Sequence, residues 1–429
     1  MRKKLETKIS RRSFLKGAVA GAALLGGSGI PYAPTVTAAA KPLKIALFEP
    51  FTGMPLSAAF SKDGYEFAML DWGKDTVAGR KIELLYIDTE LKPEIAKKKA
   101  RDAVLNDKVE ILIGEEASSI EITLGIVAKE SGIFTVIGNA VADSFTIDNY
   151  DKIYPNAVVA GGFSTNPVRG MALYMKDTAP QGATVTVLSP NYVWGWDCWD
   201  RFKKDIAKLR PDIKILPKEA EAWPRLGERN FEPFISSVMA RQPTYLFSAH
   251  WGDDAIAVVR QAKAMGALEK TKWIMSTMAC DEFRVLGAKD AMTGVIFGGF
   301  GGYWWEDPNP VMQDFGKRWY KRFGYYPGYS SSTAYAGLHL ILQIIEATKG
   351  SAKPEDILKV MFDRKWDSFA GKLPIRKIDH QLMLPYQVGE TTVIDTAPYH
   401  SLKNMKILSG EQVSLTPEEL QALRAGVKK

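Results

Sequence analysis

Short apolar runs alternate with segments of helical periodicity along most of the chain, and this alternation restricts the fold more than any other feature. Residues 44–48 and 109–114 are two such runs, whereas residues 93–106 and 253–265 carry apolar side chains at helical spacing. Strands that alternate with helices form parallel sheets that helices cover on both faces. The 429 residues are enough for two or three domains. The sequence therefore predicts an α/β protein with two lobes, each built on a parallel sheet.

The same pattern predicts where the elements begin and end. The expected strands cover residues 44–48, 81–88, 109–114, 134–137, 184–188, 245–248, 273–275 and 295–300. The expected helices cover residues 60–73, 93–106, 119–130, 166–178, 196–209, 231–241, 253–265, 310–323, 333–348 and 354–361, and a β-rich tail follows them. Ligands of open α/β sheets bind beyond the carboxyl ends of the strands. Candidate binding residues therefore lie in the segments that follow strands, at 50–56, 115–119, 138–143, 190–196, 250–253 and 276–281.

The first forty residues have a different character from the rest. Residues 10–16 read Ser-Arg-Arg-Ser-Phe-Leu-Lys, a mildly apolar run follows at residues 17–30, and three alanines end at Ala40. This order is typical of a secretory signal, and the paired arginines resemble a twin-arginine export signal. The apolar run contains five glycines and is too short to span a membrane comfortably. We therefore expect residues 1–40 to be cleaved near Ala40, which leaves a periplasmic mature chain.

The net charge of +7 belongs almost entirely to that signal. Residues 1–40 hold seven basic residues and one acidic residue, which leaves 49 basic and 48 acidic residues in the remainder. A nearly neutral mature chain lacks the basic surface that nucleic-acid binding requires. We therefore expect no nucleic-acid partner.

The sequence lacks the common catalytic and cofactor motifs. The four histidines at positions 250, 339, 380 and 400 are scattered, without the spacing of a zinc site. There is no Gly-x-Ser-x-Gly motif and no phosphate-binding loop, and Gly-Phe-Gly-Gly at residues 299–302 does not match the dinucleotide pattern. Glu115 and Glu116 are one candidate acid pair for an exported hydrolase, although consecutive side chains usually diverge. We expect a protein that is not an enzyme and that needs neither metal nor cofactor.

Several segments resemble the type I periplasmic substrate-binding proteins, and most closely the branched-chain amino-acid (leucine/isoleucine/valine) binding proteins of ABC importers. The resemblance is carried by Lys-Ile-Ala-Leu-Phe-Glu-Pro-Phe-Thr-Gly at 44–53, by Ile-Leu-Ile-Gly-Glu-Glu-Ala-Ser-Ser at 111–119, and by the strand and helix at 82–88 and 93–106. Val-Arg-Gln-Ala-Lys-Ala-Met-Gly at 259–266 and Tyr-Lys-Arg-Phe-Gly-Tyr-Tyr-Pro at 320–327 are further matches. The likeness covers about residues 43–390.

The resemblance implies two Rossmann-like lobes joined by three crossover strands, near residues 156–162, 298–303 and 368–374. The first lobe would contain residues 41–158 and 300–370, and the second residues 159–299 and 371–429. A small ligand would bind between the lobes, and hinge motion would close them around it. The closed, monomeric form would dock on membrane permease subunits whose cytoplasmic ATPases drive import. A sensor module that presents its ligand to a membrane receptor is an alternative.

The resemblance also assigns the pocket residue by residue. Ser118, followed by Ser119, corresponds to the serine that holds a ligand carboxylate at a helix start, where backbone N–H groups favour an anion. The alternative for Ser118 is a helix N-cap without a ligand. The other assigned positions are Asn139, Val141, Trp194, Trp251, Met278 and Tyr335.

Two of these positions depart from the amino-acid-binding pattern. Met278 stands where that branch has the Glu that pairs with the ligand's ammonium group, and Val141 stands where a Thr is common. Because a buried ammonium group without partners is costly, the sequence favours an aromatic or apolar carboxylate or amide. The alternative is a branched-chain amino acid or its amide, with Glu116 as the ammonium partner.

The chain contains two cysteines, Cys198 and Cys280, each close in sequence to a predicted pocket residue. An oxidising compartment permits a disulfide between them. Two separate buried thiols are the equal alternative.

Overall fold

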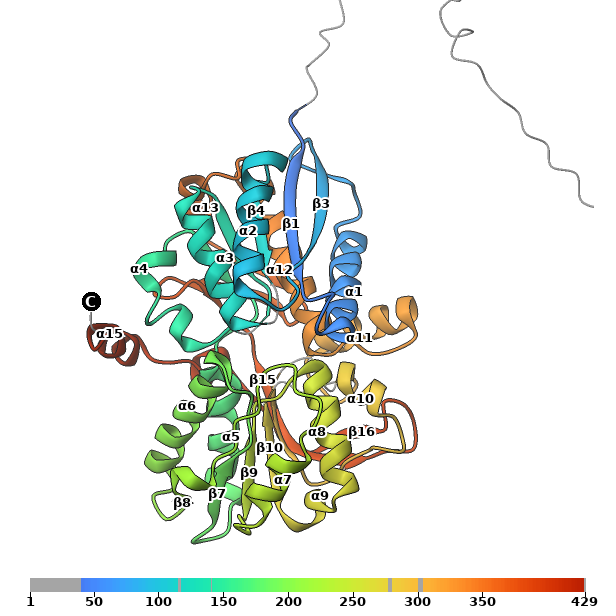
Figure 1. Cartoon of the computed structure of the whole chain (residues 1–429). Coiled ribbons are helices and arrows are strands. Elements are labelled where there is room, and N and C mark those ends of the chain that lie inside the picture. The colour runs from blue at the N-terminus through green and yellow to red at the C-terminus, as the bar shows by residue number, and fades with distance from the viewer. Residues whose placement is uncertain (1–39, 115–116, 140, 277–279, 300–303, 428–429) are drawn as a thin grey trace, which may run out of the picture. The chain divides into compact units, whose positions relative to one another are not determined.

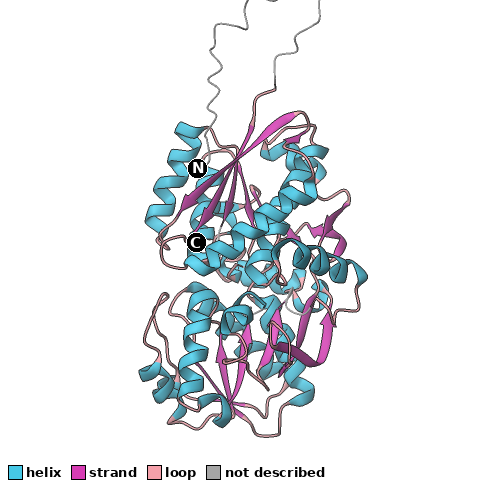
Figure 2. Ribbon diagram, turned by 90° about the vertical axis from the view of Figure 1, so that its right-hand side faces the viewer, coloured by secondary structure: helices cyan, strands magenta, loops and turns pink. Residues whose placement is uncertain are grey.

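The computed structural model of the chain describes residues 40–114, 117–139, 141–276, 280–299 and 304–427 (Figure 1). One compact unit begins at Ala40, and the residues before it, which hold most of the expected export signal, lie outside the described residues. The unit contains two sheets of mostly parallel strands with helices packed against them (Figure 2). This confirms the predicted α/β class.

The first sheet has nine strands in the order β12-β13-β14-β6-β5-β4-β1-β3-β2. The five central strands are mutually parallel, and β1 pairs with β3 along its whole length, from Leu43 beside Ile82 to Glu49 beside Asp88. The strands are β1 (Leu43–Glu49), β2 (Thr76–Val77), β3 (Arg80–Asp88), β4 (Ile111–Gly114), β5 (Phe134–Ile137), β6 (Ala157–Val159), β12 (Lys365–Ser368), β13 (Gly371–Arg376) and β14 (Gln381–Leu382). The helical segments of this first half are α1 (Pro55–Trp72), α2 (Pro93–Asp102), η1 (Ala103–Asp107), α3 (Ser118–Glu130), η2 (Asp143–Phe145), α4 (Tyr150–Ile153), α11 (Pro310–Phe323), α12 (Tyr329–Ala347) and α13 (Pro354–Val360).

The second sheet has seven strands in the order β16-β15-β11-β10-β9-β7-β8. The pairs β11–β15 and β15–β16 are antiparallel, and the other strands pair in parallel. The strands are β7 (Thr184–Val187), β8 (Lys214–Ile215), β9 (Tyr245–Ser248), β10 (Lys272–Ser276), β11 (Ile296–Gly299), β15 (Tyr386–Val393) and β16 (His400–Leu408). The helical segments of this second half are α5 (Thr165–Thr178), α6 (Val193–Leu209), η3 (Lys218–Ala220), α7 (Glu232–Met239), α8 (Gly252–Ala264), α9 (Ala267–Lys270) and α10 (Cys280–Leu286). Two short helices, α14 (Gly410–Val413) and α15 (Pro417–Ala425), end the described chain.

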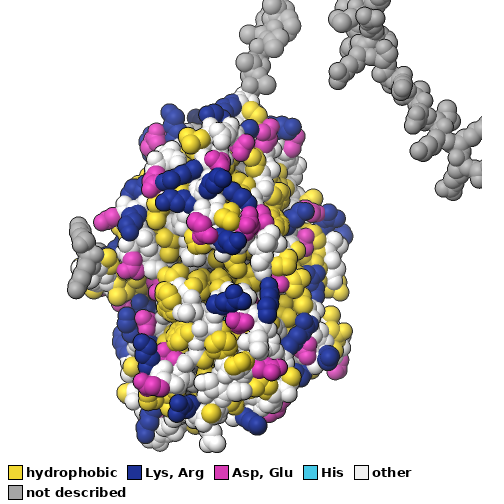
Figure 3. All heavy atoms as spheres, viewed as in Figure 1, with side chains coloured by type: hydrophobic (Ala, Val, Ile, Leu, Met, Phe, Trp, Pro, Cys, Tyr) yellow, Lys and Arg dark blue, Asp and Glu magenta, His cyan; other side chains and the backbone are white. Residues whose placement is uncertain are grey.

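Several central strands are buried on both faces. Every residue of β4, β5 and β9 is buried, which explains why the sequence shows them as continuous apolar runs rather than as alternating patterns. Charged side chains of both signs are interspersed over the face in Figure 3, as the nearly neutral composition of the mature chain predicts.

The chain passes between the sheets three times: after β6, after β11 and after β14. The first passage follows Val159, within the expected residues 156–162. The second follows Gly299, and residues 300–303 of the expected stretch 298–303 lie outside the described residues. The third follows Leu382 rather than lying near residues 368–374, because β12, β13 and β14 form successive antiparallel hairpins within the first sheet. The exact domain boundaries stay a prediction.

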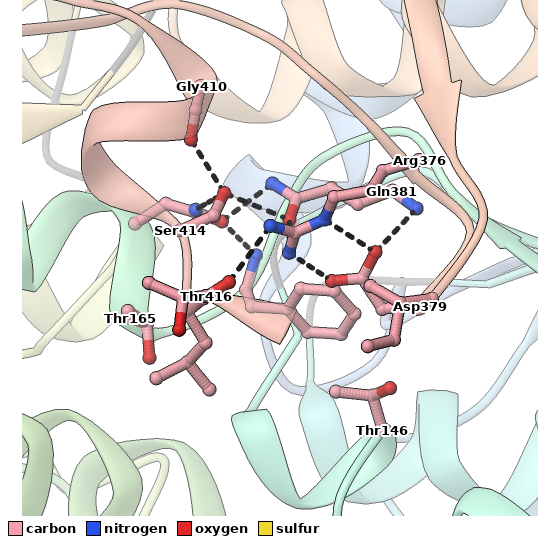
Figure 4. A network of polar contacts seen from close by, with 12 residues as sticks. Thr146, Thr165, Arg376, Asp379, Gln381, Gly410, Ser414 and Thr416 are labelled. Carbon is pink, nitrogen blue, oxygen red and sulfur yellow. Dashed lines mark hydrogen bonds and ion pairs between the residues drawn. The ribbon is translucent and has the colours of Figure 1, made fainter. Parts of the chain in front are cut away.

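The tail is the largest difference from the expected elements. After β15 and β16 it becomes helical, and both short helices begin with a capping box, at Ser409 and Thr416. Arg376 donates to Asp379 and, at 2.9 Å, to the carbonyl oxygen of Leu415, while Ser414 Oγ donates to Gly410 (Figure 4). The bond from Arg376, the last residue of β13, to Leu415 holds the tail against the first sheet.

Candidate ligand-binding site

The carboxyl edges of the two sheets face each other. The helices that follow β1 and β4, which are α1 and α3, contact the helices that follow β9 and β7, which are α8 and α6. The start of α12 lies in the same region, because α12 packs along α1 and contacts α10. The strand-following segments of both halves are therefore neighbours, as a site between two open sheets requires.

Ser118 is the first residue of α3, and its side chain is fully buried. Its Oγ accepts a hydrogen bond from the backbone N–H of Ala142 at 3.1 Å, so the hydroxyl hydrogen can be donated to another acceptor. The N-cap position of α3 belongs to Ala117, so the interpretation of Ser118 as an N-cap is wrong. Ser119 is half-buried, and its carbonyl oxygen accepts a bond from Thr123.

Asn139 and Val141 follow β5, next to Ser118. The Oδ1 atom of Asn139 accepts a hydrogen bond from Thr333 of α12, whereas its Nδ2 atom is buried and has no hydrogen-bond partner among the described residues. An unpaired buried amide costs about 1–3 kcal/mol, so this donor is available to a ligand acceptor. Val141 is fully buried in a small apolar cluster with Ile137 and Phe163.

The second half contributes aromatic side chains from the segments after β7 and β9. Trp194 is 3% exposed and its Nε1 donates to the carbonyl oxygen of Ala249 at 3.1 Å. Trp251 is 6% exposed and its Nε1 donates to the hydroxyl of Tyr192 at 2.8 Å. Burial raises the pKa of Tyr192 well above its usual value, and the Glu121 carboxylate of α3 contributes to that shift. Tyr192 therefore lies within electrostatic reach of the first half.

The structure places Tyr335 in a different group of side chains. Its hydroxyl donates to Asp71, at the C-terminal end of α1, at 3.0 Å, and its ring stacks on His339. Phe67 and Phe315 complete this aromatic cluster. These contacts separate Tyr335 from the other candidates. Glu115, Glu116 and Met278 lie outside the described residues.

Two residues next to the candidates were missed from the sequence. Tyr192 precedes α6, and Glu121 is a fully buried carboxylate one turn after Ser118 on the same face of α3. A signal existed for Glu121, because positions i and i+3 share a helix face and the sequence already placed Ser118 in the pocket.

The cysteines do not form a disulfide. Cys198 and Cys280 are both buried thiols, so the hypothesis of a bond between them is wrong. Burial raises the pKa of both thiols well above the usual value. Over the described ranges, no group of three or more His, Cys, Asp or Glu side chains is arranged to hold a metal ion. None of the helices in those ranges has the length and apolar character needed to cross a bilayer.

Comparison with known proteins gives a consistent result. A family model for periplasmic binding proteins matches residues 42–396. The Leu/Ile/Val-binding protein homolog 4 of Brucella melitensis is 24% identical over 407 residues, which is 90% of this chain and 91% of the relative.

Solved structures share the fold. A solute-binding protein of an ABC transporter from Rhodopseudomonas palustris BisB5, in complex with 3,4-dihydroxybenzoic acid, has a TM-score of 0.74 at 20% identity and covers 86% of this chain and 98% of its own. An amino-acid ABC transporter substrate-binding protein from Pseudomonas fluorescens Pf-5 has a TM-score of 0.73 at 22% identity and covers 90% and 99%.

Two open α/β sheets that face each other at their carboxyl edges define a two-lobed binding protein of type I architecture. With the match over residues 42–396, the chain belongs to the periplasmic binding protein family.

Proposed function

We propose that this protein captures a small organic ligand between its two halves and delivers it to the membrane permease of an ABC importer. The observation that supports this most directly is the placement of Ser118 and the start of α3 at one carboxyl edge, with Tyr192, Trp194 and Trp251 at the edge that faces it. A ligand that contacts both sets stabilises the closed form, because only differential affinity shifts such an equilibrium. Binding without chemical turnover is the expected activity.

The favoured ligand class is an aromatic or apolar carboxylate or amide. Ser118 and the first N–H groups of α3 offer donors to a carboxylate, and the Nδ2 atom of Asn139 offers another. The aromatic side chains offer surface for an apolar body. Relatives of the same fold were solved with 3,4-dihydroxybenzoic acid and with p-hydroxybenzoic acid, which are ligands of this kind.

A branched-chain amino acid is the second candidate. The buried Glu121 carboxylate supports it, because an α-ammonium group needs an acidic partner in a buried site. Glu116 is the ammonium partner that the sequence suggests for the same ligand. The Brucella relative is named as a Leu/Ile/Val-binding protein homologue.

The location follows from the same proposal. The export signal expected at residues 1–40 and the family to which the chain belongs both support a periplasmic protein. The mass of the protein recovered from the periplasm tests the expected cleavage near Ala40.

Thermal unfolding of the chain from Lys41 onward, first unfolded and refolded to remove any bound ligand, tests the ligand class. The panel contains 4-hydroxybenzoate, 3,4-dihydroxybenzoate, leucine, valine and simple amides. At a hundredfold excess over its dissociation constant a ligand adds about 2.7 kcal/mol, which raises Tm by roughly 5–11 °C at 2–4 °C per kcal/mol. A rise with the benzoates alone supports the favoured class, and a rise with leucine or valine moves the choice to the second candidate.

A pair of tryptophan variants distinguishes a side chain of the proposed binding site from one on the surface. Trp251→Leu should abolish most of the ligand-induced rise in Tm. Trp196→Leu is the control, since Trp196 is 48% exposed and makes its indole hydrogen bond to Asn191. An absence of any rise across the whole panel, or equal loss in both variants, argues against the proposed site.

A further inference from the structure

Three aspartates of the second half reach backbone N–H groups of the first half. Asp197 of α6 accepts from Ser144 N at 2.8 Å, and Asp253 of α8 accepts from Ser57 N at 3.5 Å. Asp281 of α10 accepts from the N–H groups at the start of α12. Each aspartate stands in the helix that follows a different strand of the second sheet, β7, β9 or β10.

The contact at Asp281 is the most extensive of the three. Its carboxylate accepts from Gly328 N at 3.1 Å, from Ser331 N at 3.3 Å and from Ser331 Oγ at 3.0 and 3.2 Å. Asp281 and Ser331 are fully buried. A carboxylate from one half therefore caps a 19-residue helix of the other half, where the helix dipole favours negative charge.

Glycines permit the close approach on both sides. A Cβ atom on Gly328 would overlap the backbone nitrogen and the carboxylate of Asp281. A Cβ atom on Gly252, immediately before Asp253, would overlap Ser57 Oγ. The fit between the halves thus depends on one glycine from each half, at two separate points.

We propose that Asp197, Asp253 and Asp281 form a carboxylate clasp, a set of positioning residues that holds the two halves closed and couples closure to proton uptake. The inference rests on the proposed function, in which closure accompanies ligand capture. The clasp predicts that these residues affect affinity through the closed form rather than by touching the ligand.

Charged and titratable side chains surround Asp281 and Asp253. Arg284, Glu282 and Cys280 share α10 with Asp281, and Tyr325, which hydrogen bonds to Asp63 of α1, faces it from the segment before α12. Burial raises the pKa of Asp281 to about 6, against the opposing effects of Arg284 and its hydrogen-bond donors. Burial likewise raises the pKa of Asp253, near Arg229 and Asp254.

Asp197 has mostly acidic neighbours. Asp143 and Asp148 face it from the segment around η2, and Asp200, Arg201 and Lys204 lie near it along α6, where Arg201 pairs with Asp143 at 3.6 Å. Burial, followed by the Asp143 carboxylate, raises the pKa of Asp197 to about 7.

The sign of the coupling follows from these shifts. In an open form these carboxyls are in water, where an aspartate has a pKa of about 3.9. Because closure raises the pKa values, the closed form binds more protons between about pH 4 and pH 7 and is favoured as the pH falls through that window. Asp281 alone should change the ratio of closed to open molecules about tenfold between pH 8 and pH 5.

The distance between spin labels across the halves tests the clasp without a ligand. Cysteines introduced as Lys97→Cys on α2 and Lys208→Cys on α6 are exposed, whereas Cys198 and Cys280 are buried. In the ligand-free chain we expect the closed fraction to rise between pH 8 and pH 5. In Asp281→Asn, the rise in the ratio of closed to open molecules between pH 8 and pH 5 should be about tenfold smaller than in the wild type.

Two further variants keep the test decisive. Gly328→Ala acts from the opposite half and should lower the closed fraction at both pH values, even where Asp281→Asn folds poorly. Asp205→Asn is the control, because Asp205 is buried on α6 but bonds to Arg169 within the second half. A closed fraction that does not change with pH, or that responds equally in Asp281→Asn and Asp205→Asn, overturns the clasp. Failure of the proposed function is recognised separately, by the absence of any thermal shift with the ligand panel.

Discussion

At the scale of single residues, the candidate site consists of groups whose hydrogen-bonding capacity is incompletely used. Ser118 Oγ accepts from Ala142, and Asn139 Oδ1 accepts from Thr333. Within the part of the chain that the structure describes, this leaves a hydroxyl hydrogen and an amide Nδ2 as buried donors. Buried donors of this kind are costly unless something accepts from them. A bound carboxylate is an acceptor that fits both, and this supports the proposal that the ligand carries a carboxylate or amide group.

The first prediction concerns Ser118. Replacing it in Ser118→Ala should weaken binding of a carboxylate ligand roughly 10- to 150-fold, because a hydrogen bond to a charged group contributes about 1.5–3 kcal/mol. Titration calorimetry with the ligand found in the thermal panel measures the change. Ser131→Ala, at the exposed far end of α3, should leave the affinity unchanged. Equal affinities for wild type and Ser118→Ala would exclude Ser118 as a ligand contact.

The second prediction concerns the cysteines. Because Cys198 and Cys280 are buried thiols with raised pKa values, the folded protein should react slowly with a thiol reagent at neutral pH. After unfolding without a reducing agent, two thiols per chain should react. Recovery of no thiols from protein purified from the periplasm would show a disulfide instead.

At the scale of elements, the contact between α1 and α12 positions the start of α12 at the site. Gly64 makes this contact possible, since a Cβ there would overlap the carbonyl oxygen of Ser331 and crowd Ala334. The contact positions Thr333 for its hydrogen bond with Asn139 and Ser331 for its hydrogen bonds with Asp281. A single helix pair therefore determines the geometry of both the pocket edge and the clasp.

The third prediction tests that packing. Gly64→Ala should lower the free energy of unfolding by about 1–3 kcal/mol, the usual cost of overpacking a close contact. Gly170→Ala is the matched control, because Gly170 also lies in a helix but has its nearest neighbour, Leu408, at 3.6 Å from the added Cβ. There the alanine should be neutral or should stabilise the helix by up to about 1 kcal/mol. Equal Tm values for the two variants would contradict this account of the α1–α12 contact.

Much of the fold was predictable from local patterns, but the contacts at the site were not. Buried strands such as β4 and β5 and helices such as α8 follow from apolar runs and periodicity, and their bounds agree with the structure to within a few residues. The function of Asp281 was not predictable, because its partners Gly328 and Ser331 are about fifty residues away and on the other half. The helical tail was missed although a capping box at Thr416 announces α15.

At the scale of the whole molecule, the C-terminal helix α15 connects the two halves away from the carboxylate clasp. Glu419 accepts from Arg169 of α5, in the second half, at 3.0 and 3.1 Å. Arg424 donates to Thr146 in the first half at 2.6 and 2.8 Å and lies 3.7 Å from the centre of the Tyr150 ring. The tail therefore supplies a link between the halves in addition to the three passages of the chain.

The fourth prediction follows from this link. Arg424→Ala removes the hydrogen bonds and the ring contact that Arg424 makes with the first half but leaves Glu419 paired with Arg169. The sheets should therefore remain folded while α15 loosens. Amide hydrogen exchange over residues 417–425 should become faster, since local opening depends on such contacts. The distribution of distances between spin labels attached at Lys97→Cys and Lys208→Cys should broaden at both pH 8 and pH 5. Arg364→Ala, whose partner is the adjacent and exposed Asp363, should change neither measurement. If Arg424→Ala exchanges like wild type, α15 is held by its apolar contacts alone and does not couple the halves. If the distance distribution broadens only at pH 8, Arg424 and the carboxylate clasp act on the same closure. Protonation of the clasp aspartates at pH 5 would then compensate for the loss of Arg424.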